Sequence, residues 1–289
     1  MQLMQPSGVR AELAAGTAEL TAAGIASARA EAELLLAHVL GCSRTRLLLG
    51  DHVGPAEAGR FHQLLNRRAT GVPLQHLTGT APFRHLELAV GPGVFIPRPE
   101  TELLVELAAP WLVAGATVVD LGAGSGAIAL SVAQEFPVAR VIAVERSERA
   151  LQWLRRNAGN RQAAGDSAVE VVPGDLTDPA LLTGLSGGVA AVLANPPYVP
   201  ESIRAGLPAE LAHDPDEALF AGPDGLALMP AVAELAARLL RPGGFLGIEH
   251  DETQAQAVSR LLSGAGCWVS VAGRPDLTGR PRFSTAVRA

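Results

Sequence analysis

The chain has 289 residues with a formal net charge of −6 at pH 7, and 48% of its residues are hydrophobic. This supplies enough apolar sequence for one large domain, or for a large domain with a smaller one. Every basic residue is an arginine, so chemistry that needs a lysine, such as Schiff-base formation, is excluded. The negative charge and the 4% aromatic content argue against non-specific nucleic-acid binding.

Several segments bear on the cellular compartment. The apolar run Val189 to Ala194 is far shorter than the ~20 residues of a membrane span, so no membrane association is expected. Met1 to Arg10 lack the apolar stretch of a signal peptide. Cys42 and Cys267 form neither a disulfide framework nor a metal-ligand pair, and His250-Asp251-Glu252 favours a supporting role over a metal site. We expect a cytoplasmic protein without a metal.

The first part of the chain is predicted to be helical. Residues 9 to 71 are rich in alanine, leucine, glutamate and arginine, with helical spacing in Ala30 to Leu40 and breaks at several glycines. Phe83 to Val90 then alternates like a strand, and Gly91-Pro92-Gly93 predicts a turn into Val94 to Ile96. We expect a small helical bundle followed by a hairpin that acts as a connector.

After Pro99, predicted strands and helices alternate, which indicates βαβ units and a mostly parallel sheet. The last two predicted strands are expected to close the sheet in antiparallel fashion. Strands are predicted at 117–121, 140–145, 169–172, 188–195, 244–249, 267–272 and 282–287, and helices at 128–136, 148–157, 225–240 and 252–263.

A glycine-rich turn lies between the first of these strands and its helix. Residues 122–126 read Gly-Ala-Gly-Ser-Gly, so the backbone can approach a nucleotide closely, and Glu145 stands where an acid binds ribose hydroxyls. Taken alone, the loop also suits NAD. Asp120 would repel a pyrophosphate but favours the ammonium or sulfonium of S-adenosylmethionine. Asp175 offers an acceptor for an adenine amino group, and Leu176 an apolar face.

The fourth strand ends in a second motif, Asn195-Pro196-Pro197-Tyr198. The prolines end the strand and make the turn stiff. In an open α/β sheet this end of the strand lies in the ligand crevice. The Asn195 side chain and the Pro196 carbonyl can accept both N–H groups of a planar nitrogen, and Tyr198 can pack on its flat face. An amide or an aromatic amine is therefore the expected acceptor.

Together these motifs identify a family. The Asn-Pro-Pro-Tyr sequence with the glycine loop resembles amino-methyltransferases, and Phe95 to Glu102 narrows the resemblance to the HemK/PrmC family of peptide chain release factor glutamine N5-methyltransferases. Similar blocks occur at Pro73 to Gly79 and Leu219 to Leu226, so the resemblance covers nearly the whole chain. In three details the chain departs from the family: Glu145 stands where aspartate is usual, His76 where tyrosine is often found, and Asp251 where glycine is common.

The resemblance implies an α/β, Rossmann-like class I S-adenosylmethionine-dependent methyltransferase fold with a small N-terminal helical domain. The implied domains are residues 1–75 for substrate recognition, 76–98 as a β-hairpin linker and 99–289 for methyl transfer. The implied reaction methylates N5 of the glutamine in the Gly-Gly-Gln motif of release factors, with S-adenosyl-L-methionine as cofactor. The implied cofactor-binding residues are Gly122, Ala123, Gly124, Ser125, Gly126, Glu145, Leu176 and Asn195.

The resemblance further assigns catalysis to Asn195, Pro196 and Tyr198, and substrate binding to these residues together with Pro197. Phe95 and Arg98 are expected to help cover the cofactor, although Arg98 also suits a salt bridge at a helix entry. Two other substrates remain open: a ribosomal-protein glutamine, which the same site would accept, and the adenine N6 of DNA or RNA. No direct nucleic-acid substrate is expected, because only a modest group of arginines occurs in the helical region.

Overall fold

The computed structural model describes residues 7–47, 49–50, 52–136 and 140–289. The chain divides into two compact units: one comprises Met1–Thr80 with Pro208–His213, and the other comprises Ala81–Leu207 with Asp214–Ala289. We call them the helical unit and the sheet unit, and each is described by itself. The division expected from the sequence, with boundaries at residues 75 and 98, stays a prediction.

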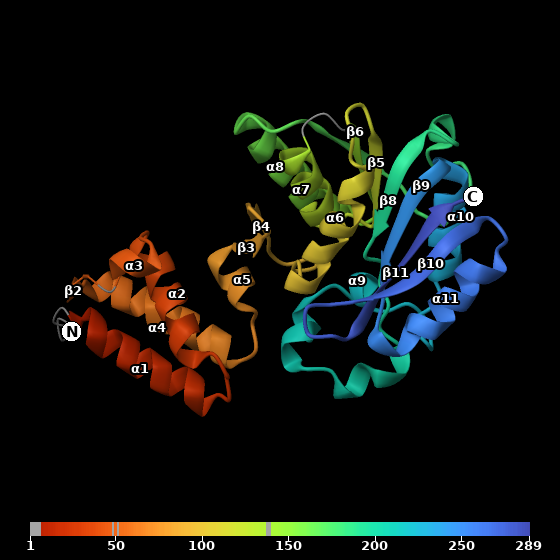
Figure 1. The fold of residues 1–289 in the computed structure, drawn as a ribbon. Helices are drawn as coiled ribbons and strands as arrows, with labels where there is room; N and C mark the ends of the chain where they lie inside the picture. The colour runs from red at the N-terminus through yellow and green to blue at the C-terminus, as the bar shows by residue number, and fades with distance from the viewer. Residues whose placement is uncertain (1–6, 48, 51, 137–139) are drawn as a thin grey trace. The chain divides into compact units, whose positions relative to one another are not determined.

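The helical unit is a bundle around its own apolar core, as the sequence predicts. Leu13, Leu35, Phe61 and Leu65 are fully buried in that core, and Pro55 occupies the first turn of one helix, where its missing N–H costs nothing. The elements are α1 Val9–Ala22, α2 Ala28–Leu40, α3 Arg44–Leu47, α4 Pro55–Ala69, α5 Leu74–Thr78 and η5 Ala209–His213, with β1 Ser7–Gly8 paired to β2 His52–Val53 (Figure 1).

Several arginines of the helical unit form ion pairs with acids. Arg68 is buried, and its guanidinium contacts Glu31 at 2.5 Å and Glu210 at 3.3 Å. Arg44 pairs with the mostly buried Glu33 at 2.5 Å, which lowers the pKa of Glu33 together with a stronger hydrogen bond from Arg29. These pairs reduce the positive charge that the unit presents.

The sheet unit contains a seven-stranded sheet in the order β10-β11-β9-β8-β5-β6-β7. Strands β5 to β9 run parallel, whereas β11 pairs antiparallel with both β9 and β10, as predicted. The strands are β5 Thr117–Leu121, β6 Arg140–Glu145, β7 Val169–Pro173, β8 Val189–Ala194, β9 Leu240–Glu249, β10 Trp268–Pro275 and β11 Pro281–Arg288.

Helices cover both faces of this sheet. The chain runs from β5 outward to β7 and then returns to β8 on the other side of β5, so the strand order reverses between β5 and β8. Such a reversal opens a crevice at the carboxyl ends of the two strands. The helices are α6 Glu102–Ala108, α7 Ala127–Glu135, α8 Glu148–Ala163, α9 Asp216–Leu219, α10 Met229–Leu239 and α11 Ala255–Gly264, with η1 Pro99–Thr101, η2 Ala109–Trp111, η3 Thr183–Leu185, η4 Glu201–Gly206 and η6 Glu252–Gln254.

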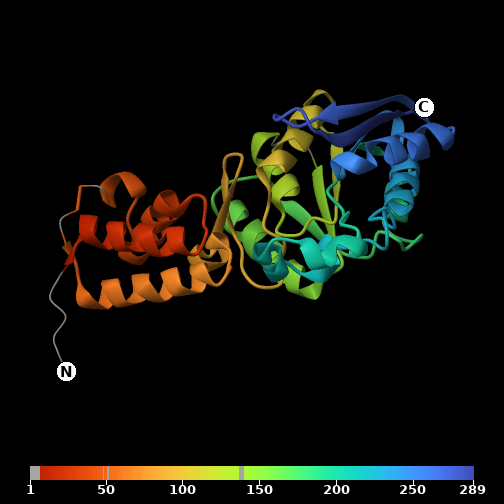
Figure 2. The same ribbon diagram turned by 90° about the horizontal axis from the view of Figure 1, so that it is seen from below.

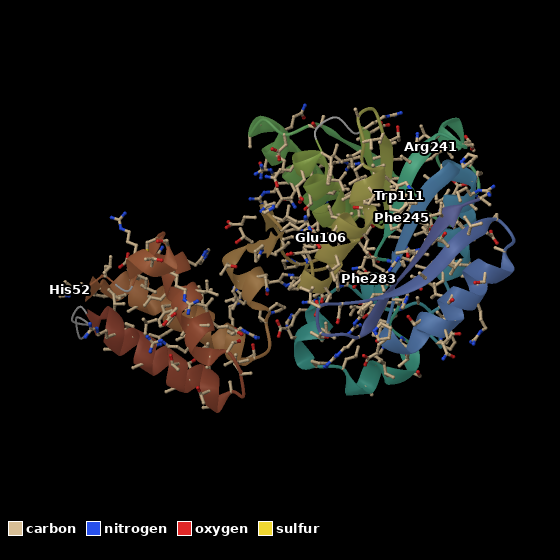
Figure 3. All side chains as sticks on the ribbon, viewed as in Figure 1. His52, Glu106, Trp111, Arg241, Phe245 and Phe283 are labelled. Carbon is tan, nitrogen blue, oxygen red and sulfur yellow. The ribbon has the colours of Figure 1, made fainter. Side chains whose placement is uncertain are left out.

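Alternating side chains of the strands point to opposite faces of the sheet and pack into two separate hydrophobic cores. Figures 1 and 2 show α6, α7 and α8 on one face of the sheet and α10 and α11 on the other. On the first face, Trp111 stacks on Phe245 with ring centroids 4.5 Å apart, and Phe283 is fully buried in the same cluster (Figure 3). On the second face, Val192 and Ile248 pack against α10 and α11. The central strands are therefore buried on both sides.

Two predicted strands are wrong. The expected strand from Phe83 to Val90 is two strands, β3 Thr80–Phe83 and β4 Leu86–Ala89, and the expected strand from Val94 to Ile96 is absent from this described segment. The turn falls at Arg84, whose φ of 49° is left-handed. Its guanidinium donates to Glu135 at 2.5 and 2.7 Å and stabilises the turn through a contact distant in sequence. Alternation alone does not reveal such a turn.

Candidate active site

The glycine loop leaves open space beside the carboxyl end of β5. A Cβ atom added at Gly122 or Gly124 would meet no other atom within 4 Å, whereas one at Gly126 would lie 2.7 Å from the Leu154 side chain. The first two glycines therefore border free space, and Gly126 permits close packing of the loop on α8. Ala123 and Ser125 are buried and complete the turn.

Glu145 joins the loop to the end of β6. Its side chain is mostly buried, and Oε2 accepts a hydrogen bond of 2.8 Å from the Gly124 N–H. Oε1 accepts 2.8 Å bonds from the N–H groups of Arg146 and Ser147. A carboxylate has room for about four such bonds, so one acceptor position is left for a ligand hydroxyl. The longer glutamate thus reaches the loop directly.

Asp120 lies at the end of β5, and only 1% of its surface is exposed. Oδ2 accepts a 3.0 Å hydrogen bond from the Ala129 N–H, while Oδ1 makes none within the described residues. Burial raises the pKa of Asp120 to about 7; the Ala129 hydrogen bond opposes this rise and the charge of Glu145 adds to it. A buried carboxylate with an unused oxygen suits a cationic ligand, because a nearby positive charge would stabilise its ionised form.

An open hollow of about 880 Å³ lies at the carboxyl ends of β6 and β7. Asp175 borders it, but its Oδ1 accepts bonds of 2.8 and 2.7 Å from the N–H and hydroxyl of Thr177, which lower its pKa. Leu176 packs against the second core. The hollow is lined by Arg146, Ser147, Glu148, Arg149, Gly174, Asp175, Pro215, Asp216 and Glu217.

The Asn-Pro-Pro-Tyr corner follows β8 directly. Leu121 pairs with Ala194 in the parallel ladder, so the glycine loop and Asn195 leave the sheet at the same edge. Asn195 is half-buried, and its Nδ2 donates a 3.0 Å hydrogen bond to Oγ1 of Thr101. Pro196 is buried and Pro197 half-buried. The structure therefore brings the two predicted motifs together.

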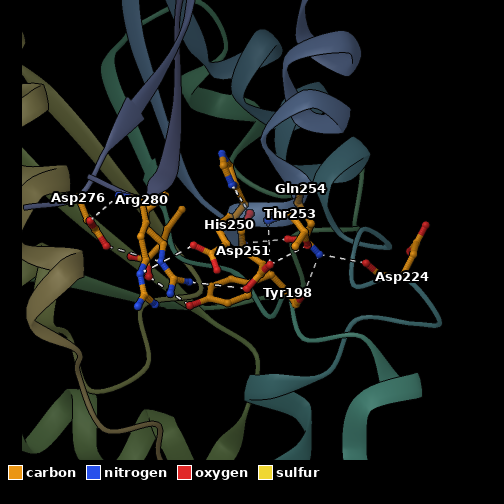
Figure 4. A network of polar contacts seen from close by, with 11 residues as sticks. Tyr198, Asp224, His250, Asp251, Thr253, Gln254, Asp276 and Arg280 are labelled. Carbon is orange, nitrogen blue, oxygen red and sulfur yellow. Dashed lines mark hydrogen bonds and ion pairs between the residues drawn. The ribbon is translucent and has the colours of Figure 1, made fainter. Parts of the chain in front are cut away.

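Distant residues brace this corner. Gln254 donates through Nε2 to the carbonyl oxygens of Tyr198 at 2.9 Å and Asp224 at 3.0 Å, as Figure 4 shows. Gly225 touches the same Tyr198 carbonyl: an added Cβ would lie only 2.0 Å from that oxygen. The N–H of Asp251 donates to Gln254 Oε1 at 3.0 Å. Sequence reasoning missed Gln254, whose role depends on contacts with distant segments.

Glu249 is a second residue that sequence reasoning missed. It ends β9 with 2% of its surface exposed, and its Oε1 accepts a 3.3 Å hydrogen bond from the Tyr198 hydroxyl. Burial raises the pKa of Glu249 to about 7, although hydrogen bonds from Thr101 and Tyr198 oppose the rise. Burial also raises the pKa of Tyr198. The available signal was an acid ending an otherwise apolar strand.

Arg98 makes a salt bridge across a long stretch of sequence. Its Nη2 contacts Oδ2 of the buried Asp214 at 2.5 Å, and the N–H of Ile96 donates to Oδ1 of the same aspartate at 3.3 Å. The guanidinium also lies 4.9 Å from the centre of the Phe95 ring. These contacts tie the segment before α6 to the segment that leads into α9.

The acids around His250 have structural partners. Asp251 caps η6 by accepting a 2.9 Å bond from the Thr253 N–H (Figure 4). His250 Nε2 lies 2.9 Å from the Ser284 hydroxyl. Among the described residues, no group of three or more His, Cys, Asp or Glu side chains is arranged to hold a metal ion. A search of the same residues finds no helix long and apolar enough to cross a membrane.

Comparison with known proteins gives matches over both units. Residues 13–79 match the PrmC N-terminal domain and residues 87–222 the methyltransferase small domain. The release factor glutamine methyltransferase of Mycolicibacterium smegmatis is 51% identical over 97% of this chain and 98% of its own. That of Deinococcus radiodurans is 44% identical over 96% and 97%. A solved methyltransferase from Pyrococcus furiosus shares the fold, with 19% identity, a TM-score of 0.50 and coverage of 70% and 88%. The predicted methyltransferase fold is confirmed.

Proposed function

The chain belongs to the family of release factor glutamine methyltransferases, and we propose that it methylates N5 of the glutamine in the Gly-Gly-Gln motif of peptide chain release factors. The observation that carries the chemistry is the meeting of the glycine loop and the Asn195 corner at one sheet edge. The choice of substrate rests on the relatives, each of which matches along nearly its whole length.

The loop edge fits S-adenosyl-L-methionine, which supplies an electrophilic methyl group when bound. Gly122 and Gly124 border the space in which the cofactor would lie against the protein backbone. The buried Asp120 carboxylate suits the positively charged end of the cofactor. Glu145 has an acceptor position left for a ribose hydroxyl, and the hollow beyond it has room for an adenine. Leu176 supplies an apolar surface there. No phosphate-binding cation is required.

The corner fits a primary amide, which is a poor nucleophile because its lone pair is delocalised. Asn195 Oδ1 and the Pro196 carbonyl accept its two N–H groups, which orients the nitrogen and stabilises positive charge that develops on it. Tyr198 packs on the flat face, with its ring direction fixed by Glu249. Pro197 keeps the turn stiff. In this proposal the protein acts by orientation and hydrogen bonding.

Residues 1–75 are proposed to recognise the protein substrate. The unit has its own core and pairs several of its arginines with acids, among them Arg44 and Arg68, which suits a protein partner better than a nucleic acid. A ribosomal-protein glutamine would offer the same reacting amide, and an adenine amine has the same two N–H groups. The relatives' substrate distinguishes these possibilities in favour of release factors.

The proposal is tested by incubating the protein with S-adenosylmethionine carrying a tritiated methyl group. Separate reactions contain a release factor, the same factor with its Gly-Gly-Gln glutamine changed to alanine, a ribosomal protein and duplex DNA. We expect label only in the unaltered release factor. Label only in DNA, or equal label in the glutamine-free factor, would defeat the assignment.

A further inference from the structure

Thr101 is the side chain in contact with the amide of Asn195. The amide nitrogen Nδ2 donates to Thr101 Oγ1 over 3.0 Å. A side-chain amide has a donor end and an acceptor end, so a hydrogen bond at Nδ2 turns Oδ1 the other way. Thr101 lies 94 residues earlier in the chain, 4% exposed, in the 3-10 turn that leads into α6. Thr101 is therefore held by a segment of the chain other than the corner.

Glu249 lies beside Asn195, at the end of the neighbouring strand. Ala194 pairs with Ile248 in the ladder, so Asn195 and Glu249 are neighbours at the ends of β8 and β9. Glu249 Oε1 accepts a 3.3 Å hydrogen bond from the Tyr198 hydroxyl, and the Thr101 hydroxyl opposes the rise in the pKa of the same carboxyl group. A hydroxyl oxygen can accept a hydrogen bond, and here the Thr101 oxygen accepts from Asn195.

We propose that Thr101 is a positioning residue that holds the Asn195 amide with its oxygen toward the reacting substrate nitrogen. The inference rests on the proposed function, because it assigns a role within that same site. Asn195 Nδ2 donates to Thr101 Oγ1, and the Tyr198 hydroxyl donates to Glu249 Oε1. Thr101 and Glu249 are both buried, and each contacts one polar side chain of the corner.

Removing the Thr101 hydroxyl removes the contact that fixes the orientation of the Asn195 amide. With Thr101→Val the side chain keeps its shape, but the Asn195 amide loses its acceptor and can rotate by half a turn. The NH₂ group would then face the N–H groups of the substrate, where two donors repel each other. A purely structural role for Thr101, supporting the start of α6, would change stability without changing the orientation of the amide.

The kinetic test compares Thr101→Val with the matched control Thr101→Ser, which keeps the hydroxyl. We expect kcat to fall at least tenfold in the valine variant, because misalignment of a reacting group is costly, while the Kd for S-adenosylmethionine changes less than twofold. The serine variant should retain most of the activity. A valine variant with kcat within twofold of the unaltered protein, or a serine variant equally impaired, would overturn the proposal.

A second measurement requires no methyl acceptor. In protein labelled with ¹⁵N-asparagine, the Asn195 side-chain signal is identified by its loss in Asn195→Ala. We expect its Nδ2 protons to exchange slowly with solvent in the unaltered protein and in Thr101→Ser, and at least tenfold faster in Thr101→Val. Unchanged exchange in Thr101→Val refutes the positioning role. Failure of the unaltered enzyme to methylate release factor counts against the proposed function alone.

Discussion

Asp120 and Glu249 are carboxyl groups at the edge of the sheet that carries the active site. Burial raises the pKa of each to about 7, so each ionised form is held in the fold at a cost. Residues that perform chemistry are often kept in such unfavourable surroundings. Asp120 Oδ1 has no hydrogen-bond partner among the described residues, which indicates a ligand whose binding would offset this cost.

Replacing Asp120 by asparagine should therefore stabilise the cofactor-free protein at high pH. The folded protein keeps the proton up to about pH 7, whereas the unfolded chain loses it near the ordinary pKa of 3.8. The folded state binds more protons in this window, so stability falls as pH rises through it. We expect Asp120→Asn to gain on the order of 4 kcal/mol over the unaltered protein at pH 8, and little at pH 4.

Urea unfolding at the two pH values measures this gain, and calorimetric titration measures the affinity for S-adenosylmethionine. Affinity should fall about 10- to 100-fold, because a charge-assisted contact is worth about 1.5–3 kcal/mol. Comparing the variant with the unaltered protein cancels the titration of Glu249, which both share. Full cofactor affinity in Asp120→Asn would show that the carboxylate does not contact the cation.

Site residues whose chemistry follows from their residue type and their place at a strand end could be predicted from the sequence. Site residues whose role depends on contacts with distant segments could not. Glu145 and Asn195 stand at strand ends, where their side chains have few other uses. Thr101, Glu249 and Gln254 act through hydrogen bonds to residues from 50 to more than 90 positions away, which no local pattern encodes. Their positions became evident only from the fold.

The corner after β8 combines a local feature that the sequence predicts with an orientation that depends on distant segments. Its stiffness is local, since Pro196 and Pro197 restrict the backbone of the residues before them. The orientation of the corner is set by residues of other segments, because Gly225 and Gln254 contact the Tyr198 carbonyl. The predicted strands from Thr117 to Glu145 match the structure, because buried parallel strands are continuous apolar runs.

A methyl group at Gly225 should displace the corner. The added carbon would lie 2.0 Å from the Tyr198 oxygen, so the turn carrying Asn195 must move. We expect Gly225→Ala to lower kcat on the order of 100-fold, since a shift of about 1 Å in a reacting group has that effect. Methylation kinetics measured beside circular dichroism separate this from unfolding.

Gly243→Ala is the matched control for that variant. Gly243 has a φ of 77°, close to the 76° of Gly225, but an added carbon there meets nothing within 4 Å. It should cost about 1–2 kcal/mol of stability from backbone strain and leave kcat nearly unchanged. An equal loss of kcat in both variants would mean that strain, and not the contact with Tyr198, is responsible.

For the molecule as a whole, the reversal of strand order between β5 and β8 explains how motifs 70 residues apart form one site. The cofactor loop follows one of these strands and the amide-binding corner the other. Chain-order alternation predicted such a sheet, but the position of the turn at Arg84 in the separate β3–β4 hairpin and the inclusion of Pro208–His213 in the helical unit required long-range contacts. The helical unit supplies a separate surface on which a protein substrate is proposed to dock.

The central claim is that the Asn195 amide binds the reacting nitrogen, and Asn195→Ala tests it most directly. Single-turnover methylation of release factor and the Kd for S-adenosylmethionine are measured on this variant, with the exposed Asn66→Ala as control. The account predicts an unchanged Kd and a rate reduced on the order of 100-fold or more, as when one oriented hydrogen-bonding group is removed from an active site. A rate equal to that of Asn66→Ala would contradict it.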